Sequence, residues 1–258
     1  MTFNKVLDIR LNEADLALDF GVDIFHPETV EERYLNDIRN SLLDSEATGP
    51  ELLYSIAMDV GKKKHEKDLI DRNLLYGIVA YNSGLIGSEL VRSQGHIHAV
   101  SPSCNSSTPE VYEIWQGEAY IYMQEFVAEK PGRCVAVLAK PGDIVIVPPK
   151  WAHYTVNASQ HQKMLFGAWC IRDYAFDYKE IRARQGLAYY PVVTEGEINW
   201  IQNPNYSHEG VEVKNAREYQ EFGLSKRNLY TQYEENPSRF DFVTDPLKYQ
   251  NLWNDFQP

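Results

Sequence analysis

The sequence is poor in three things: cysteine, basic residues and long apolar runs. Its three cysteines are odd in number and show no C-x-x-C spacing, which is typical of a protein from a reducing compartment. Acidic residues outnumber basic ones by 37 to 25, and the net charge of −12 argues against a nucleic-acid surface or an anionic membrane, because both require a basic patch. No apolar run approaches the ~18 residues of a transmembrane helix, and the N-terminus becomes charged before an apolar segment forms. We therefore expect a cytoplasmic protein with no membrane or nucleic-acid partner.

A flexible linker is absent as well. No Gly/Ser-rich or Pro-rich stretch divides the 258 residues, which are enough to bury one substantial core. Between residues 74 and 168, short apolar runs recur between turn signals, a spacing typical of a meandering sheet or barrel. We expect a single domain with a barrel at residues 52–206, an N-terminal extension at 1–51 that contains a helix packed on the barrel, and a helical C-terminal extension at 207–258.

The two ends of the chain carry helix patterns. Residues 27–43 predict an amphipathic helix, because apolar side chains recur on one stripe and acidic residues crowd its first turn. Residues 215–218 form a capping-box sequence closed by Gly223, and residues 245–253 predict another helix. The segment from Ser207 onward contains nine aromatic residues, so we expect it to pack on the barrel or on a partner subunit.

Histidine and glutamate recur where strands are expected. His96 and His98 are two residues apart, so on a strand both side chains point to the same face. A further strand begins at Glu110, where Glu110 and Tyr112 share one face. Residues 143–147 form a continuous β-branched run, which predicts a strand buried on both faces and ended by the prolines that follow it.

His153 completes the set, because it lies on the strand after that run and can meet His96 and His98 across a barrel. Three imidazoles and one carboxylate suit Fe, Mn, Zn, Ni or Cu and leave positions open for water or substrate. Glu113 is an alternative fourth ligand, although a regular strand turns it away from the face of Glu110. The Ser- and Pro-rich residues 101–109 predict a solvent-exposed loop, for which a lid role is conceivable.

These motifs carry a resemblance to a known family. The chain resembles the cupins and, more narrowly, the cupin-type (archaeal-type) glucose-6-phosphate isomerases, over roughly residues 52–206. The resemblance implies a mainly β fold, a cupin barrel (double-stranded β-helix) with helical N- and C-terminal extensions. Its matching segments are 95–98, 109–112, 141–157 and 177–181, followed by Gly186.

The resemblance also implies a chemistry, the interconversion of glucose 6-phosphate and fructose 6-phosphate in glycolysis and gluconeogenesis by a homodimer. One divalent metal ion per subunit is expected, with Fe²⁺ favoured over Mn²⁺, Zn²⁺ or Ni²⁺. Its implied ligands are His96, His98, Glu110 and His153, of which Glu110 and His153 are also the expected catalytic residues. The implied contacts to the sugar phosphate are Ser93, Gly95, Tyr112 and Tyr178.

Two routes and two other functions stay open. A base such as Glu110 can move a proton through a cis-enediol, or a hydride can shift between the two carbons. A metal-binding cupin of this ligand set can instead be a dioxygenase or act on another sugar phosphate. A cupin that binds a sugar phosphate without turnover is a third interpretation, which Phe176 favours because the family usually has histidine at that position. Tyr112 and Tyr178 can also be plain core residues.

Overall fold

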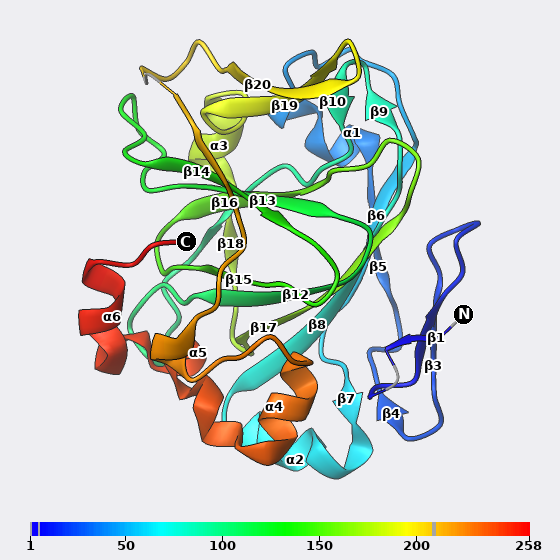
Figure 1. Ribbon diagram of the computed structural model, residues 1–258, viewed down its shortest axis with the longest axis vertical. Coiled ribbons are helices and arrows are strands. Elements are labelled where there is room, and N and C mark those ends of the chain that lie inside the picture. Colours follow the sequence, from blue (N-terminus) through cyan, green and yellow to red (C-terminus); the bar gives the residue numbers. More distant parts are fainter. Residues whose placement is uncertain (1, 5, 208–209) are drawn as a thin grey trace.

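Two sheets face each other and form a β-barrel at the centre of the chain (Figure 1). The computed structural model describes residues 2–4, 6–207 and 210–258. The six-stranded sheet has the order β15-β12-β17-β8-β6-β5, with β5 Glu31–Tyr34, β6 Leu52–Ala57, β8 Leu74–Tyr81, β12 Glu110–Gln116, β15 Ile144–Val147 and β17 Met164–Ile171. The four-stranded sheet has the order β16-β13-β14-β21, with β13 Ala119–Gln124, β14 Cys134–Ala139, β16 Ala152–Asn157 and β21 Glu212–Asn215. The prediction of a mainly β barrel with helical C-terminal segments is confirmed.

The barrel core comes from alternate residues of both sheets. On β12, Tyr112 and Ile114 belong to the cluster inside the barrel, whereas Val111 and Trp115 face a second cluster outside it. All four residues of β15 are buried, as expected for a strand covered on both faces. Successive side chains of a strand point to opposite faces, so this alternation decides which residues can reach the interior.

The turn between β12 and β13 depends on a glycine. Gly117 has φ +74°, a left-handed conformation that costs residues with a Cβ more than it costs glycine. A Cβ at this position would also lie 2.9 Å from the carbonyl oxygen of Lys163. The turn lets β13 leave for the second sheet directly after β12, which begins with Glu110.

Smaller elements cover the barrel. The short strands are β1 Thr2–Asn4, β2 Ile9–Leu11, β3 Leu18–Phe20, β4 Ile24–Phe25, β7 Gly61–Lys62, β9 Leu85–Ile86, β10 Glu89–Leu90, β11 Ile97–His98, β18 Phe176–Asp177, β19 Tyr189–Thr194 and β20 Glu197–Gln202. The α-helices are α1 Leu35–Ile38, α2 Glu66–Asp71, α3 Lys179–Ala183, α4 Leu229–Glu235, α5 Asp241–Thr244 and α6 Gln250–Asn254. The 3-10 turns are η1 Arg39–Ser41, η2 Lys63–His65, η3 Gln220–Phe222, η4 Pro237–Phe240 and η5 Pro246–Tyr249. Across the described residues, no helix combines the length and the apolar character that a membrane crossing requires.

The predicted helix at residues 27–43 is wrong over most of its length. Residues 31–34 form strand β5, which pairs antiparallel with β6, and only α1 and η1 are helical. Exposed and partly buried residues alternate poorly on β5, so its pattern could not be distinguished from a helix face. Backbone pairing with the exposed edge of β6 decides the conformation, because tertiary hydrogen bonds override a weak helix preference.

Of the two C-terminal helix predictions, one is wrong and one is confirmed. The capping-box sequence at 215–218 does not start an α-helix, because Asn215 ends β21, whose backbone pairs parallel with β14. Only the 3-10 turn η3 follows, and Gly223 ends it in the left-handed conformation at φ +68°. The helix at 245–253 is confirmed as η5 followed by α6.

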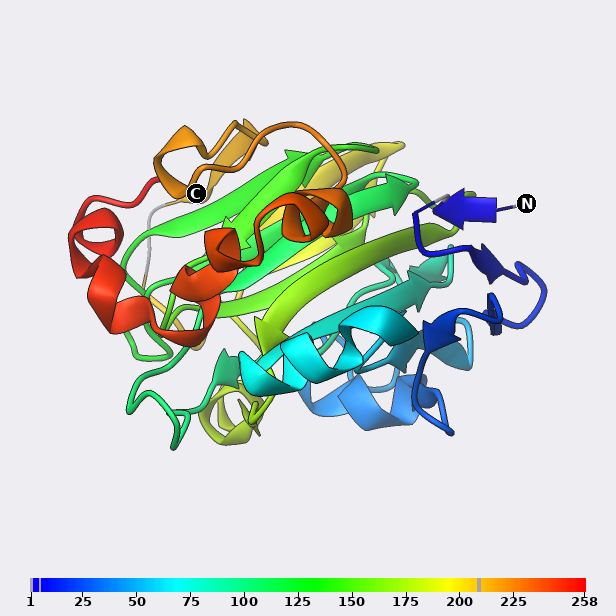
Figure 2. The ribbon, with the colours of Figure 1, turned by 90° about the horizontal axis from the view of Figure 1, so that it is seen from below.

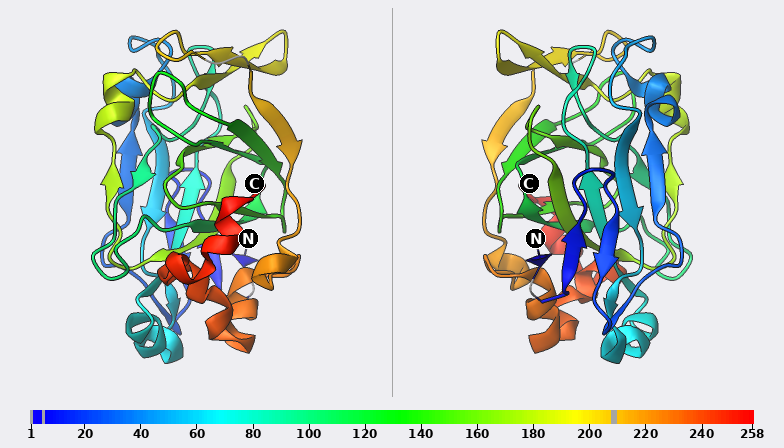
Figure 3. Two further views of the ribbon diagram at one scale, coloured as in Figure 1. Left: turned by 90° about the vertical axis from the view of Figure 1, so that its left-hand side faces the viewer. Right: turned by 90° about the vertical axis from the view of Figure 1, so that its right-hand side faces the viewer.

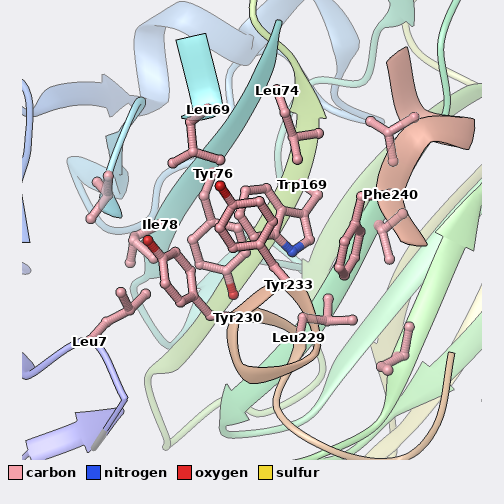
Figure 4. Close-up of a cluster of buried hydrophobic side chains, with 14 of the residues drawn as sticks. Leu7, Leu69, Leu74, Tyr76, Ile78, Trp169, Leu229, Tyr230, Tyr233 and Phe240 are labelled. Carbon is pink, nitrogen blue, oxygen red and sulfur yellow. The ribbon is translucent and has the colours of Figure 1, made fainter. Parts of the chain in front are cut away.

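The aromatic residues of the C-terminal segment pack on the barrel of the same chain. Helices α4 and α5 lie against the outer face of β8 and β17 together with α2 (Figure 2), at the end of the molecule opposite β19 and β20 (Figure 3). In Figure 4, Tyr230, Tyr233 and Phe240 surround Trp169 of β17, whose ring centre lies 5.0 to 5.6 Å from theirs. The segment therefore contributes to the core of this chain, and β5 and β21 extend the barrel sheets. The division of the chain at residues 51 and 206 stays a prediction.

Candidate metal centre

The two histidine motifs pair with each other through backbone hydrogen bonds. His96 and His153 form an antiparallel bridge, in which each backbone N–H donates to the carbonyl of the other at 3.0 Å. His98 follows on β11, two residues along the same face. Gly95 precedes them with φ +89°, and a Cβ there would lie 3.4 Å from the carbonyl oxygen of His153. The positive φ therefore favours glycine at position 95.

Glu110 starts β12 and points into the barrel. Its Oε2 lies 3.3 Å from Nε2 of His98 and 3.3 Å from Nε2 of His153, and it accepts a hydrogen bond of 2.7 Å from the hydroxyl of Tyr112. One donor atom from each of four residues lies within 4.8 Å of the others, and the four residues are His96, His98, Glu110 and His153. The predicted ligand set is thus assembled in space, and this group could hold a metal ion.

The alternative ligand Glu113 lies on the other face of β12. Its carboxylate accepts hydrogen bonds from the backbone N–H of Leu229 at 2.9 Å and from the side chain of Asn228 at 3.1 Å. It therefore caps the start of α4 on the outside of the barrel and has no part in the four-residue group.

The contacts of the imidazole rings fit the tautomer that a metal site needs. Nδ1 of His98 lies 2.9 Å from the carbonyl oxygen of Thr108, and Nδ1 of His153 lies 3.3 Å from that of Trp151. A proton on Nδ1 leaves the lone pair on Nε2, the atom that faces the group. Nε2 of His96 and Nε2 of His98 are both buried without a hydrogen-bond partner, which is costly unless a further ligand satisfies them. This chemistry fits a divalent transition metal.

The charges in the group favour the protonation states that bind a metal ion. Burial, together with the neighbouring His153 and His98, lowers the pKa of His96 well below its usual value. Burial alone would raise the pKa of Glu110, but the neighbouring imidazoles of His153 and His98 outweigh it and hold that pKa well below its usual range. Neutral imidazoles and an ionised carboxylate are the forms that bind a metal ion.

A cavity of about 170 Å³ opens beside the group. All four predicted substrate residues, Ser93, Gly95, Tyr112 and Tyr178, line it. Ser93 Oγ accepts from the backbone N–H of Thr155 at 3.1 Å, and the hydroxyl of Tyr112 is held by Glu110. The structure thus brings these residues to one cavity, and their contacts to a substrate stay predictions.

Phe176 forms an apolar wall of the cavity. Its ring centre lies 4.2 Å from that of His96 and 5.5 Å from that of His98. β18 pairs with β11 so that Phe176 lies opposite His98, which brings the side chain to this position. Any polar contact expected of a histidine at this position must therefore come from another residue.

The loop at 101–109 differs from the prediction of a solvent-exposed segment. Only its tip is exposed, whereas Ser101, Ser106, Ser107 and Thr108 are buried. Asp173 accepts hydrogen bonds from the hydroxyls of Ser101 and Ser103, which ties the loop to the end of β17. Nothing in this arrangement supports a lid, because the buried residues would have to lose their contacts for the loop to move.

Sequence reasoning missed several residues that line the cavity. Glu31 and Arg33 come from β5, a strand in the segment for which the sequence predicts a helix. Tyr54, Phe166 and Tyr174 also line it, and they carry no motif that distinguishes them from other core aromatics. If residues 31–34 are taken as a strand, Glu31 and Arg33 lie on one face, and this spacing is the signal that identifies them.

Comparisons with known proteins agree with the motifs. The family model described as "Glucose-6-phosphate isomerase (GPI)" matches residues 38–209, about two thirds of the chain. The glucose-6-phosphate isomerase of Thermococcus onnurineus (strain NA1) is 28% identical over 174 residues, which are 67% of this chain and 86% of that one. The enzyme of the same name from Pyrococcus horikoshii is 28% identical over 179 residues, 68% of this chain and 87% of that one.

The similar solved structures each match only part of the chain. Oxalate decarboxylase from Bacillus subtilis is 17% identical with a TM-score of 0.34, and the match covers 48% of this chain and 27% of that one. The family match, in contrast, spans two thirds of the chain and includes all of the assembled donor residues. On this match, the chain belongs to the glucose-6-phosphate isomerase family.

Proposed function

We propose that this protein interconverts glucose 6-phosphate and fructose 6-phosphate by moving hydrogen between C1 and C2 of the open-chain sugar. The observation that carries the proposal is the group of three imidazoles and one carboxylate at the wall of a cavity, in a chain of this family. Family membership supports the reaction, and the donor group supports a metal-dependent way of performing it.

The proposed ligands are Nε2 of His96, Nε2 of His98, Nε2 of His153 and the carboxylate of Glu110. Nitrogen and oxygen donors of this kind suit Fe²⁺, which we propose as the native ion, with Mn²⁺, Zn²⁺ or Ni²⁺ as substitutes. When bound, such an ion supplies Lewis acidity that polarises the sugar carbonyl and acidifies the neighbouring C–H.

Glu110 is the residue placed to handle the proton. Its Oε2 receives the contacts from Tyr112, His98 and His153, and among the described residues no hydrogen bond is made to Oε1. In the cis-enediol route, Oε1 takes the proton from one carbon and returns it to the other, while Tyr112 keeps the carboxylate oriented. The hydride route requires no such base, and Glu110 then acts through its charge alone. His153 contributes in both routes by orienting Glu110.

Turnover in D₂O separates the two routes. A proton held on Glu110 exchanges with water, so the cis-enediol route incorporates deuterium at C1 or C2 when turnover takes place in D₂O. A hydride shift keeps the original hydrogen. Compared at equal metal content, substitution of Glu110 by glutamine should then slow the enediol route far more than the hydride route.

Substrate placement is proposed along the cavity. The sugar oxygens lie toward the donor group, and Ser93, the N–H of Gly95, Tyr112 and Tyr178 offer polar contacts to the rest of the molecule. Phe166 and Phe176 supply apolar walls that exclude water from the reacting carbons. On the same resemblance, we also propose a homodimer in the cytoplasm. Light scattering of the purified protein tests the dimer.

The decisive experiment measures interconversion by chelated protein before and after Fe²⁺, Mn²⁺ or Zn²⁺ is added back. We expect no turnover without metal and restored turnover with it. His96→Ala and His153→Ala should bind less metal and lose turnover. His161→Ala is the matched control, because His161 is exposed and outside the donor group.

Three results would overturn parts of the proposal. Turnover that survives stringent chelation excludes the metal-dependent reaction. Metal and fructose 6-phosphate binding without turnover would instead identify a sugar-phosphate-binding cupin. Oxygen uptake on a candidate substrate, with no isomerisation, would identify a dioxygenase.

A further inference from the structure

The cavity beside the donor group is short of positive charge. Its polar lining is made of hydroxyls, an amide, imidazole and two carboxylates, and within the described parts of the chain Arg33 is the only lysine or arginine that lines it. The protein as a whole has a net charge of −12, so the general field does not attract an anion. Apart from a metal ion on the donor group, a phosphorylated sugar in this cavity therefore depends on one basic side chain to balance its charge.

Strand pairing directs Arg33 into the cavity. Arg33 lies opposite Tyr54 on β6, and Tyr54 lies opposite Tyr81 on β8. Residues that face one another across a sheet share a face, so the three side chains form a row. The rings of Tyr54 and Tyr81 stack at 4.7 Å between centres, and all three residues line the cavity. Arg33 thus occupies the outer end of a row that leads inward.

The guanidinium of Arg33 donates from Nη1 to the backbone carbonyl of Glu32 at 3.1 Å and from Nη2 to a carboxylate that a ligand can replace. Its Nη2 donates to the carboxylate of Glu31 at 2.5 Å, and the Arg33 side chain keeps 31% of its surface exposed. Both residues lie on β5, at the edge of the six-stranded sheet. An ion pair between partly exposed side chains contributes little net stability, so a stronger anion can replace Glu31 at small cost.

A second arginine near the cavity is less available. Arg182 donates from Nε to Gln94 at 2.9 Å, and its guanidinium lies over the ring of Tyr178 at 5.0 Å. It does not belong to the cavity lining. Arg33 is therefore the basic side chain that a ligand in the cavity meets.

We propose that Arg33 binds the phosphate group of the substrate and that Glu31 holds the guanidinium ready when no phosphate is present. The inference deepens the proposed function and rests on it. A guanidinium presents two parallel N–H donors that match the oxygens of a phosphate. Arg33 lies outside residues 38–209, so it supplies this contact from a segment that the family match does not include.

The pair of Glu31 and Arg33 gives a test with opposite signs. Glu31→Gln removes the competitor for the guanidinium and should lower KM for fructose 6-phosphate, by about twofold or more. Arg33→Gln removes the phosphate contact and should raise KM about 10- to 100-fold with kcat changed little, because the contact is far from the reacting carbons. An ion pair with only a structural role would give both variants the same direction of change, since each one breaks the same pair.

The experiment measures kcat, KM and metal content for wild type, Glu31→Gln, Arg33→Gln and Arg33→Lys. Arg33→Lys keeps the charge but loses the paired donors, so its KM should lie between those of wild type and Arg33→Gln. Arg10→Gln is the matched control and should leave KM unchanged, because Arg10 is exposed, pairs with Asp8 and does not belong to the cavity lining. An unchanged KM in Arg33→Gln, or KM shifts of the same sign in the Glu31 and Arg33 variants, would overturn the inference.

Binding measurements keep this test separate from the test of the reaction. Calorimetric titration with inorganic phosphate and with fructose 6-phosphate does not require turnover. If wild type binds both but does not isomerise, weaker binding by Arg33→Gln upholds the phosphate contact while the proposed reaction fails. If the protein isomerises and Arg33→Gln binds both probes as tightly as wild type, the reaction stands and the role of Arg33 is rejected.

Discussion

Two glutamates on one strand, three residues apart, have opposite roles in this protein. Glu110 points into the barrel, where two imidazoles and a tyrosine hydroxyl contact its Oε2. Glu113 points outward, where it accepts hydrogen bonds from Asn228 and from the backbone of Leu229 at the start of α4. The same residue type therefore belongs to the candidate metal centre on one face of β12 and stabilises a helix on the other face.

The difference appears in the pKa of the two carboxyls. Burial raises the pKa of Glu113, and the hydrogen bonds from Leu229 and Asn228 offset this only in part. At Glu110, burial acts in the same direction, but the imidazoles of His153 and His98 outweigh it and lower the pKa. Residue type does not decide whether a buried carboxylate serves a metal site; the groups on its face of the strand do.

The largest effect should follow a change on the inner face. Glu110→Gln keeps the shape of the side chain but removes the charge, so we expect kcat/KM to fall by about 10² to 10⁴-fold. Metal content should fall as well, because an amide is a weaker ligand than a carboxylate. Steady-state kinetics and elemental analysis measure both. Retention of full activity and metal would remove Glu110 from the site.

A change on the outer face should affect stability alone. Glu113→Ala leaves the N–H of Leu229 and the amide of Asn228 without an acceptor, and we expect it to lower the free energy of unfolding by about 1 to 3 kcal/mol. Urea unfolding of the metal-loaded protein measures this, with Glu113→Gln as the milder control. A loss of metal comparable to that of Glu110→Gln would break the separation between the two faces.

Tyr112 sharpens the comparison, because its hydroxyl donates to Glu110 at 2.7 Å. Tyr112→Phe removes one hydrogen bond to a charged group, so we expect about a tenfold loss of kcat/KM with little change in stability. Trp115→Phe on the outer face of the same strand is the matched control and should leave kcat/KM within about twofold of wild type. Equal losses in the two variants would mean that the effect comes from general packing of β12.

The smallest effect concerns pH and Glu113. Because the folded-state pKa of Glu113 is raised above its ordinary value, the folded protein binds its proton more tightly than the unfolded chain between these two pKa values. The stability contribution of this carboxyl therefore falls as pH rises through that window. The free energy of unfolding of metal-free wild type, minus that of metal-free Glu113→Gln, should decline with increasing pH. A difference that rises with pH would contradict the raised pKa.

The accuracy of the sequence predictions follows the range of the interactions involved. His96, His98, Glu110 and His153 could be found because strand periodicity and short spacings determine the direction of each side chain. The opposite placement of Glu113 followed from the same rule. The helix at 27–43 failed because its residues satisfy a helical stripe equally well, and only pairing with β6 makes residues 31–34 a strand.

Arg33 illustrates what no local rule could supply. Its approach to the cavity depends on β5 joining the sheet at Arg33 opposite Tyr54, a contact between segments that the sequence alone does not align. The buried part of the loop at 101–109 is a similar case, because Asp173, distant in sequence, supplies the acceptors that hold it.

The sequence by itself determined the identities of the donor residues, the faces on which they lie and the mainly β character of the chain, because these depend on periodicity over a few residues. The tertiary structure decided that the four donors meet within 4.8 Å, that Glu113 caps a helix and that Arg33 reaches the cavity. These facts depend on which distant strands pair and in which register, and the free energy of that choice comes from burial shared across the whole barrel.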